Sequence, residues 1–172
     1  MNALPVEDRF AIEDLFARYS WALDTGDPDA LAMTFAPDGK AIEEVFEDAD
    51  VWEGRDGIRA LGRHFMRSPN FPGRQHHLSM PQYFPRDADH VGSRSFVFVT
   101  ECHGEPPMVL RFAGYYIDEL VRLDGEWLFA SRIIRMWDGE ILKNFPGRGE
   151  WVPRKRPPDL VVQSRSESVA ER

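Results

Sequence analysis

Apolar residues recur at spacings of three and four over residues 7–24, a pattern typical of an amphipathic helix. The residues on this apolar face are Ile12, Leu15, Phe16, Tyr19 and Leu23. Gly26 supplies a natural helix stop, and Asp27 followed by Pro28 supplies the cap and first turn of a second short helix reaching Phe35. The pattern predicts two helices in a hairpin.

A third helix and then a change of period follow along the chain. The helical spacing returns over residues 56–66, through Ile58, Leu61, Phe65 and Met66. β-branched and aromatic residues between turn signals then predict four strands, after a first short strand at 41–46. The four ranges are 75–84, 90–102, 107–122 and 126–137. Asp124-Gly125 is a strong signal for a tight hairpin between the last two strands. Helices followed by an antiparallel sheet that packs one face over them indicate an α+β fold.

The length of 172 residues, with 42% hydrophobic and 29% charged residues, fits one globular domain. We expect this domain to span residues 1–145 and residues 146–172 to form an irregular tail. The basic run Arg154-Lys155-Arg156 falls in the tail, where we interpret it as solvated. No internal repeat interrupts the domain.

The charge balance and cysteine count exclude several classes of partner. A formal net charge of -8 argues against nucleic acid, which is bound through clustered Lys and Arg. Cys102 is the only cysteine, so no intramolecular disulfide or multi-cysteine metal site is possible. The N-terminus lacks the features of a signal peptide, and no stretch approaches about 18 apolar residues. We therefore expect a cytoplasmic protein with no membrane partner.

The chain lacks the common catalytic motifs: a Gly-rich phosphate loop, a GxSxG elbow and an HExxH metal pair. The absence of these motifs argues against the commonest classes of kinase, hydrolase and metalloprotease. Any catalysis would come from dispersed Asp, Glu, His, Tyr and Arg side chains gathered in a pocket, which is general acid–base chemistry. No metal and no organic cofactor are expected.

Asp24 and His76 are the first candidates for that chemistry. Asp24 ends the first predicted helix, where a carboxylate faces the negative end of the helix dipole; the alternative is a solvated acid beside a turn. His76 and His77 are adjacent on a predicted strand, so they point to opposite faces. His76 shares its face with Leu78 and Met80, which favours it as the inward histidine, either as a core residue or as a proton shuttle.

Two arginines and a surplus of aromatic residues complete the candidates. Arg132 and Arg135 should face opposite sides of the last strand unless a bulge intervenes, so at most one lines a cavity. Most of the aromatic residues must pack in the core, but the surplus also suits a pocket for a flat, apolar ring. The aromatic residues that we expect to contact such a substrate are Trp21, Phe35, Trp52 and Phe112.

Three short motifs together resemble the SnoaL-like group of the nuclear transport factor two superfamily. They are Tyr19-x4-Asp24-x2-Asp27, Gln75-His76 and Asp124-Gly125-Glu126-Trp127, within a match over residues 7–137. The resemblance is strongest to the branch of scytalone dehydratase, bile-acid dehydratase and lindane dehydrochlorinase. It implies a cone-shaped half-barrel of curved antiparallel sheet, with three N-terminal helices around an apolar cavity, assembled as a trimer or dimer.

The resemblance also implies roles for individual residues. The Asp-His catalytic dyad of that branch falls on Asp24 and His76, and its tyrosine five residues before the aspartate falls on Tyr19. An arginine near the end of the last strand falls on Arg135 or Arg132, of which Arg135 is the predicted catalytic one. A second histidine and a Ser/Asn pair of scytalone dehydratase correspond to three positions that differ here and that point to a different substrate: Glu101, Gly114 and Tyr116. We expect Glu101 and Tyr116 to contact that substrate.

The implied function is a cofactor-independent lyase that eliminates water from a hydrophobic aromatic or polycyclic molecule, in the catabolism of aromatic compounds. Three alternatives remain open. The first is a lyase that releases formaldehyde from a lignin-derived diarylpropane. The second is an isomerase or polyketide cyclase that uses an aspartate base alone. The third is a ligand-binding module without catalysis, because a fold does not fix a function.

Overall fold

The computed structural model describes residues 3–67, 73–102, 109–138, 141 and 155–156. Three helices and six strands make up this part of the chain. The helices are α1 (Val6–Thr25), α2 (Pro28–Met33) and α3 (Gly54–Met66). The strands are β1 (Phe35–Glu44), β2 (Asp50–Glu53), β3 (Arg74–Pro85), β4 (His90–Glu101), β5 (Val109–Leu123) and β6 (Glu126–Met136). All three helices and the later strands predicted from the sequence are confirmed.

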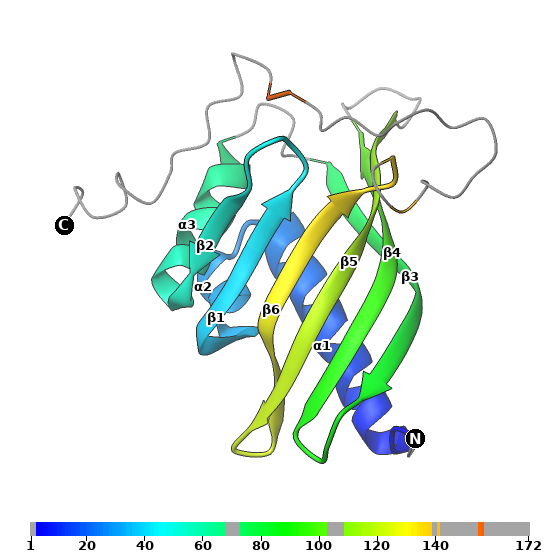
Figure 1. Ribbon diagram of the computed structural model, residues 1–172. Coiled ribbons are helices and arrows are strands. Elements are labelled where there is room, and N and C mark those ends of the chain that lie inside the picture. Colours follow the sequence, from blue (N-terminus) through cyan, green and yellow to red (C-terminus); the bar gives the residue numbers. More distant parts are fainter. Residues whose placement is uncertain (1–2, 68–72, 103–108, 139–140, 142–154, 157–172) are drawn as a thin grey trace.

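The six strands form one curved, open sheet in the order β2-β1-β6-β5-β4-β3, with the helices on one face (Figure 1). The predicted α+β class and curved sheet are confirmed. The sheet is mixed, however, because β1 pairs with β6 in parallel while every other pairing is antiparallel. After the β1–β2 hairpin, the chain passes through α3 to β3, at the opposite edge of the sheet. The strands β3, β4, β5 and β6 then follow one another back across the sheet, so that β6 lies next to β1.

The core lies between α1 and the concave face of the sheet. The apolar face predicted for α1 is buried at all five positions, from Ile12 to Leu23. Phe16 stacks on Phe129 of β6 with ring centroids 5.8 Å apart, and the Tyr19 ring meets the same residue at 5.6 Å. The aromatic surplus therefore first serves to join α1 to the sheet.

The turn after α1 sets the position of Asp24. Gly26 adopts the left-handed conformation with φ 73°, and its N–H bonds to the carbonyl of Ala22. The Asp27 side chain then accepts a 2.9 Å hydrogen bond from the Ala30 N–H and caps α2, as the sequence predicts. Asp24 consequently lies in the last turn of α1, at the end that faces the start of β3.

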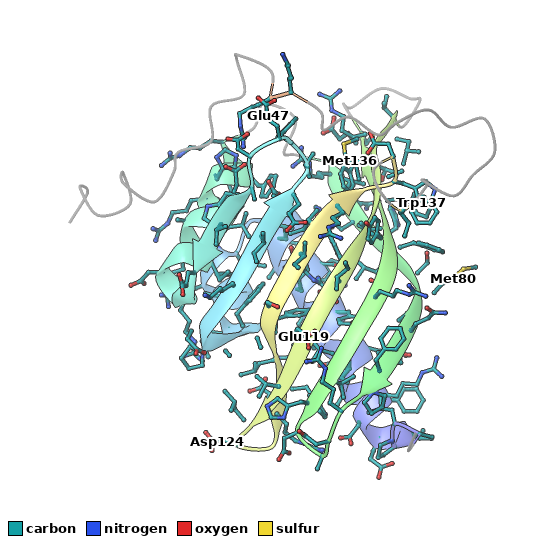
Figure 2. All side chains as sticks on the ribbon, viewed as in Figure 1. Glu47, Met80, Glu119, Asp124, Met136 and Trp137 are labelled. Atoms are coloured by element: carbon teal, nitrogen blue, oxygen red, sulfur yellow. The ribbon has the colours of Figure 1, made fainter. Side chains whose placement is uncertain are left out.

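A two-residue turn joins β5 to β6, and Asp124 marks its tip in Figure 2. Asp124 and Gly125 both have positive φ, 52° and 83°, as a tight hairpin turn requires. The predicted hairpin is confirmed. The register that it sets shifts by one residue between Leu120 and Glu119, and beyond this shift Arg132 lies opposite Asp118 across the two strands.

A bulge in β3 interrupts the alternation of inward and outward side chains that was used to place Met80 on the same face as His76. The pairing with β4 shifts between Ser79 and Gln82, and Met80 has φ 51°. Met80 is 74% exposed and projects away from the sheet in Figure 2. It does not share the inward face of His76, although Leu78 packs against the core.

The predicted tail lies outside the described residues except for Lys155 and Arg156. Arg156 is not simply solvated: it donates a 2.8 Å hydrogen bond to the Asp50 carboxylate and lies 4.9 Å from the ring centroid of Phe46. Its guanidinium is therefore tied to the loop between β1 and β2. The predicted boundary at residue 145 stays a prediction.

Candidate functional site

A cavity of about 210 Å³ opens between α1, α3 and the concave face of the sheet. Its wall is largely aromatic and aliphatic, with a histidine, a glutamate and two arginines. The lining residues are Tyr19, Leu23, Glu43, Val45, Phe46, Phe65, Arg74, His76, Val99, Arg111, Phe112, Tyr116 and Ile134. A small apolar pocket with a few polar groups is the usual form of a small-molecule site.

Asp24 and His76 form a hydrogen-bonded pair at the cavity wall. The Oδ1 of Asp24 lies 2.5 Å from the ring Nδ1 of His76, and Oδ2 accepts a 2.6 Å hydrogen bond from the His76 backbone N–H. The two side chains are 15% and 9% exposed, respectively. Two donors from one residue stabilise the carboxylate that the sequence placed at the unfavourable end of a helix dipole.

The hydrogen bond to Asp24 determines which ring nitrogen of His76 carries the proton. An ionised carboxylate only accepts hydrogen bonds, so Nδ1 carries the proton. In the neutral ring Nε2 is then the acceptor. Asp24 thus orients His76 and makes its Nε2 available as a base. His77, by contrast, is exposed and bonds to the Thr100 hydroxyl at 3.0 Å.

Tyr19 and Tyr116 bring two phenols to the same wall. Both are buried, at 2% exposure each, and their rings meet edge to face with centroids 6.3 Å apart. Burial raises the pKa of Tyr19 to about 12, and burial together with nearby Tyr19 raises the pKa of Tyr116 well above its ordinary value. Both phenols therefore stay protonated at neutral pH and can donate hydrogen bonds.

Glu43, on β1, is a second acid–base group on the cavity wall. Burial raises its pKa to about 7, with a further contribution from Asp50, against the opposing effect of Arg156 and Arg74. Such a carboxyl is partly protonated at neutral pH and can act as an acid or a base there. The predicted substrate contact Glu101, by contrast, does not line the cavity.

Arg132, a predicted substrate contact, lies in the core and not on the cavity. Its guanidinium forms a two-point ion pair with Asp118, at 2.8 and 2.9 Å, and neither side chain is exposed. The rings of Tyr19, Tyr116 and Phe129 surround it at 4.0 to 4.2 Å. Arg132 is fully buried in this pair and does not line the cavity, so we assign it a structural role.

Arg135, the predicted catalytic arginine, also lies away from the cavity. Its Nε donates a 2.6 Å hydrogen bond to the Glu44 carboxylate, on the face of the sheet opposite the helices. Arg132 and Arg135 face opposite sides of β6, as their spacing of three residues predicts. The inward arginine, Arg132, is paired with Asp118, a partner that the alternation of β6 does not reveal.

The remaining predicted contacts divide between the cavity, the core and the surface. Phe112 and Tyr116 line the cavity, as predicted. Phe35 and Trp52 are buried in the core instead: Phe35 packs against the Tyr19 ring, and Trp52 packs against His64 of α3. Trp21 is 71% exposed on the outer side of α1, since it falls off the apolar helix face.

Sequence reasoning missed Glu43, Arg74 and Arg111, although two of them carry a detectable signal. Glu43 shares a strand face with buried Ala41, and a lone acid on an apolar strand face is unusual. Arg74 lies two residues before His76, so the same alternation that turned His76 inward applies to it. Arg111 falls at a shift in the pairing of β4 with β5, which no sequence pattern announces.

Among the described residues, no three His, Cys, Asp or Glu side chains are grouped so that they could hold a metal ion. In the same part of the chain, no helix combines the length and the apolarity needed to cross a membrane.

Comparison with known proteins gives a family match: the SnoaL-like domain matches residues 5–133. A search of the curated proteins finds no match to the chain. Among solved structures, a variant of Rv3472 from Mycobacterium tuberculosis, a protein of unknown function, is 26% identical with a TM-score of 0.67. That match covers 81% of this chain and 79% of the other.

Two structures from Novosphingobium aromaticivorans are also similar. One is a protein of the nuclear transport factor two type with a cystatin-like fold, at 24% identity and a TM-score of 0.69, covering 78% of this chain and 84% of that one. The other, a candidate scytalone dehydratase, is 26% identical with a TM-score of 0.64, covering 76% of this chain and 85% of that one. These likenesses agree with the curved sheet and helices described above.

Proposed function

The chain belongs to the SnoaL-like domain family, and on that premise we propose that it is a cofactor-independent lyase that eliminates water from a ring-containing small molecule. The observation that carries the proposal is the Asp24–His76 pair at the wall of an aromatic-lined cavity. A base oriented by a carboxylate and facing an apolar pocket is suited to removing a proton from carbon. The likeness to a candidate scytalone dehydratase supports the same reaction class.

The first step uses the ring nitrogen of His76 that Asp24 leaves free. Nε2 takes a proton from the substrate carbon next to the carbon that bears the hydroxyl. The Asp24 carboxylate, 2.5 Å from Nδ1, stabilises the imidazolium that forms. Catalysis by a positioned general base of this kind is typically worth about 10²- to 10⁴-fold in rate.

The second group needed is an acid for the leaving hydroxyl, and we assign this role to Glu43. As the carbon–oxygen bond breaks, the protonated Glu43 carboxyl transfers its proton to the departing oxygen, which leaves as water. The electron pair of the broken C–H bond becomes the new carbon–carbon double bond, so no oxidant or reductant is required. Proton transfer from His76 to Glu43 through solvent restores both groups. A pKa of about 7 leaves Glu43 partly protonated for this task at neutral pH.

Tyr19 and Tyr116 are the hydrogen-bond donors of the proposed site. Both phenols line the cavity and keep their protons at neutral pH. A phenol O–H directed at a substrate oxygen stabilises negative charge that develops there in the transition state. Arg135 and Arg132 have no part in this mechanism, because ion pairs with Glu44 and Asp118 occupy their charges.

A substrate screen tests the proposal. The purified protein would be incubated with a panel of hydroxylated aromatic and polycyclic compounds, and products would be followed by mass spectrometry. We expect at least one compound to lose water with wild-type protein and not with His76→Gln. Loss of formaldehyde instead would identify the retro-aldol lyase.

The other outcomes of the screen point elsewhere. A product of unchanged mass that persists in His76→Gln would indicate an isomerase that uses the aspartate alone. Compounds that bind in the cavity without any conversion would indicate a ligand-binding module. Either outcome would contradict the lyase proposal.

A further inference from the structure

Three charged residues gather where neighbouring strands β3, β4 and β5 begin or end. Arg74 is the first residue of β3, Glu101 the last of β4, and Arg111 lies near the start of β5. The two arginines line the cavity. The mechanism proposed above uses none of the three.

The geometry shows two guanidinium groups sharing one buried carboxylate. Arg74 Nη2 donates to Glu101 Oε1 at 3.1 Å, and Arg111 Nε lies 3.6 Å from Glu101 Oε2. The Glu101 and Arg74 side chains are 1% and 13% exposed, whereas Arg111 is 58% exposed. Glu101 thus holds Arg74 against the cavity wall, where its guanidinium also lies 5.4 Å from the ring centroid of Phe65.

Arg74 retains a donor that the protein does not use. Within the described part of the chain its Nε is buried and has no hydrogen-bond partner. A buried, charged N–H without an acceptor is costly, and a ligand that supplies the acceptor removes this cost. Guanidinium groups bind carboxylates with paired, charge-assisted hydrogen bonds.

The charges of the described residues at this wall do not cancel. Arg74 and Arg111 carry two positive charges, and Glu101 supplies one negative charge. Glu43 on the same cavity is only partly ionised at neutral pH, because burial raises its pKa to about 7. Arg74 and Arg111 therefore bring more positive charge than Glu101 offsets at the ends of their strands, and the other ionised carboxylate beside the cavity, Asp24, is held by His76.

We propose that the substrate carries an anionic group, a carboxylate on or next to its ring, and that Arg74 and Arg111 bind this group in the cavity. Arg74 supplies the buried contact, and Arg111, at the exposed rim, supplies the outer one. The anchored carboxylate would fix which ring carbon faces His76. This inference rests on the proposed function only in placing the substrate in the same cavity.

Binding of two matched probes tests the inference without any turnover. 2-Naphthoate and 2-naphthamide have the same bicyclic ring and nearly the same shape, and only the first is charged. Isothermal titration calorimetry should show that wild-type protein binds 2-naphthoate about tenfold or more tightly, as expected for charge-assisted hydrogen bonds. Arg74→Gln should remove this preference and leave 2-naphthamide binding within about twofold.

Three further variants keep the test selective. Arg111→Gln changes an exposed residue, so it should fold normally and reduce the preference by a smaller factor. Arg94→Gln is the matched control, because Arg94 is exposed on β4 and bonds to Gln82 outside the cavity. It should bind both probes as wild type does. His76→Gln should abolish any turnover and keep the preference for the anion, which separates the two proposals.

Equal affinity of wild type for the two probes, or no binding of either, would overturn the inference. A preference that survives in both Arg74→Gln and Arg111→Gln would do the same. Lyase activity on a neutral compound alone, lost in His76→Gln, would leave the proposed reaction standing and refute only the anionic substrate.

Discussion

Replacement of Asp118 by asparagine should lower the free energy of unfolding by about 3–5 kcal/mol. The change keeps the size of the side chain and removes the counter-charge of Arg132, whose guanidinium has no exposure to solvent. It also replaces one of the two oxygens that accept the Arg132 hydrogen bonds of 2.8 and 2.9 Å by an NH₂ donor. The aromatic rings around Arg132 compensate only part of the lost charge, since a cation over a ring is worth about 2 kcal/mol when desolvated.

The adjacent residue offers a matched control for this experiment. Glu119 is labelled in Figure 2 and pairs with Arg86 on the surface, with side chains 40% and 60% exposed. Exposed pairs contribute about 0–1 kcal/mol, so Glu119→Gln should be nearly neutral. Urea unfolding at neutral pH measures both variants, with an unchanged m-value as the check that both unfold in the same way.

The melting temperature gives a second measure. A loss of 3–5 kcal/mol corresponds to a fall of roughly 6–20 °C for a domain of this size. If Asp118→Asn lies within 1 kcal/mol of Glu119→Gln, the structural role assigned to Arg132 is wrong. The double variant Asp118→Leu with Arg132→Met removes both charges and should be more stable than Asp118→Asn alone, because no buried charge is left without a partner.

Three other predictions concern the cavity and its surroundings. The Glu43 carboxyl keeps its proton up to about pH 7 in the folded chain, whereas it loses the proton near pH 4.5 in the unfolded chain. The free energy of unfolding of the wild type should therefore decrease as the pH rises from 4.5 to 7, relative to that of Glu43→Gln, and urea titrations at pH 5 and pH 8 measure this difference. Gly114→Ala should cost about 1–3 kcal/mol in unfolding, because its Cβ would overlap the Arg135 carbonyl and lie 2.6 Å from the Phe112 ring. Trp21→Ala should leave 2-naphthoate affinity unchanged, since Trp21 is 71% exposed and off the cavity; a loss of affinity would restore it as a contact.

The elements of this fold could be predicted from the sequence because local signals agree with the tertiary structure. The α1 face from Ile12 to Leu23 is buried as its spacing indicates, and Gly26, Asp27 and Asp124-Gly125 form the turns that their conformational preferences favour. The parallel pairing of β1 with β6 could not be predicted, because it depends on how the chain crosses the sheet and not on any local pattern.

The candidate site was predictable in part. Spacing offered Asp24 and His76 only as weak candidates and the resemblance supplied most of the support for them; in the structure the Asp24 Oδ1 and the His76 Nδ1 lie 2.5 Å apart. The roles of Arg132 and Arg135 depend on which acid each one meets across the sheet, which alternation alone does not reveal. A cytoplasmic location and assembly into a dimer or trimer stay predictions.

The turnover of a compound found in the substrate screen, compared between His76→Gln and His77→Gln, tests the central claim most directly. The two histidines are neighbours on β3, but only His76 lines the cavity and pairs with Asp24, while His77 is exposed. We expect kcat to fall by about 10²- to 10⁴-fold in His76→Gln, to fall comparably in Asp24→Asn, and to stay within about twofold in His77→Gln. Equal rates in the two histidine variants would contradict the assignment of the Asp24–His76 pair as the catalytic base.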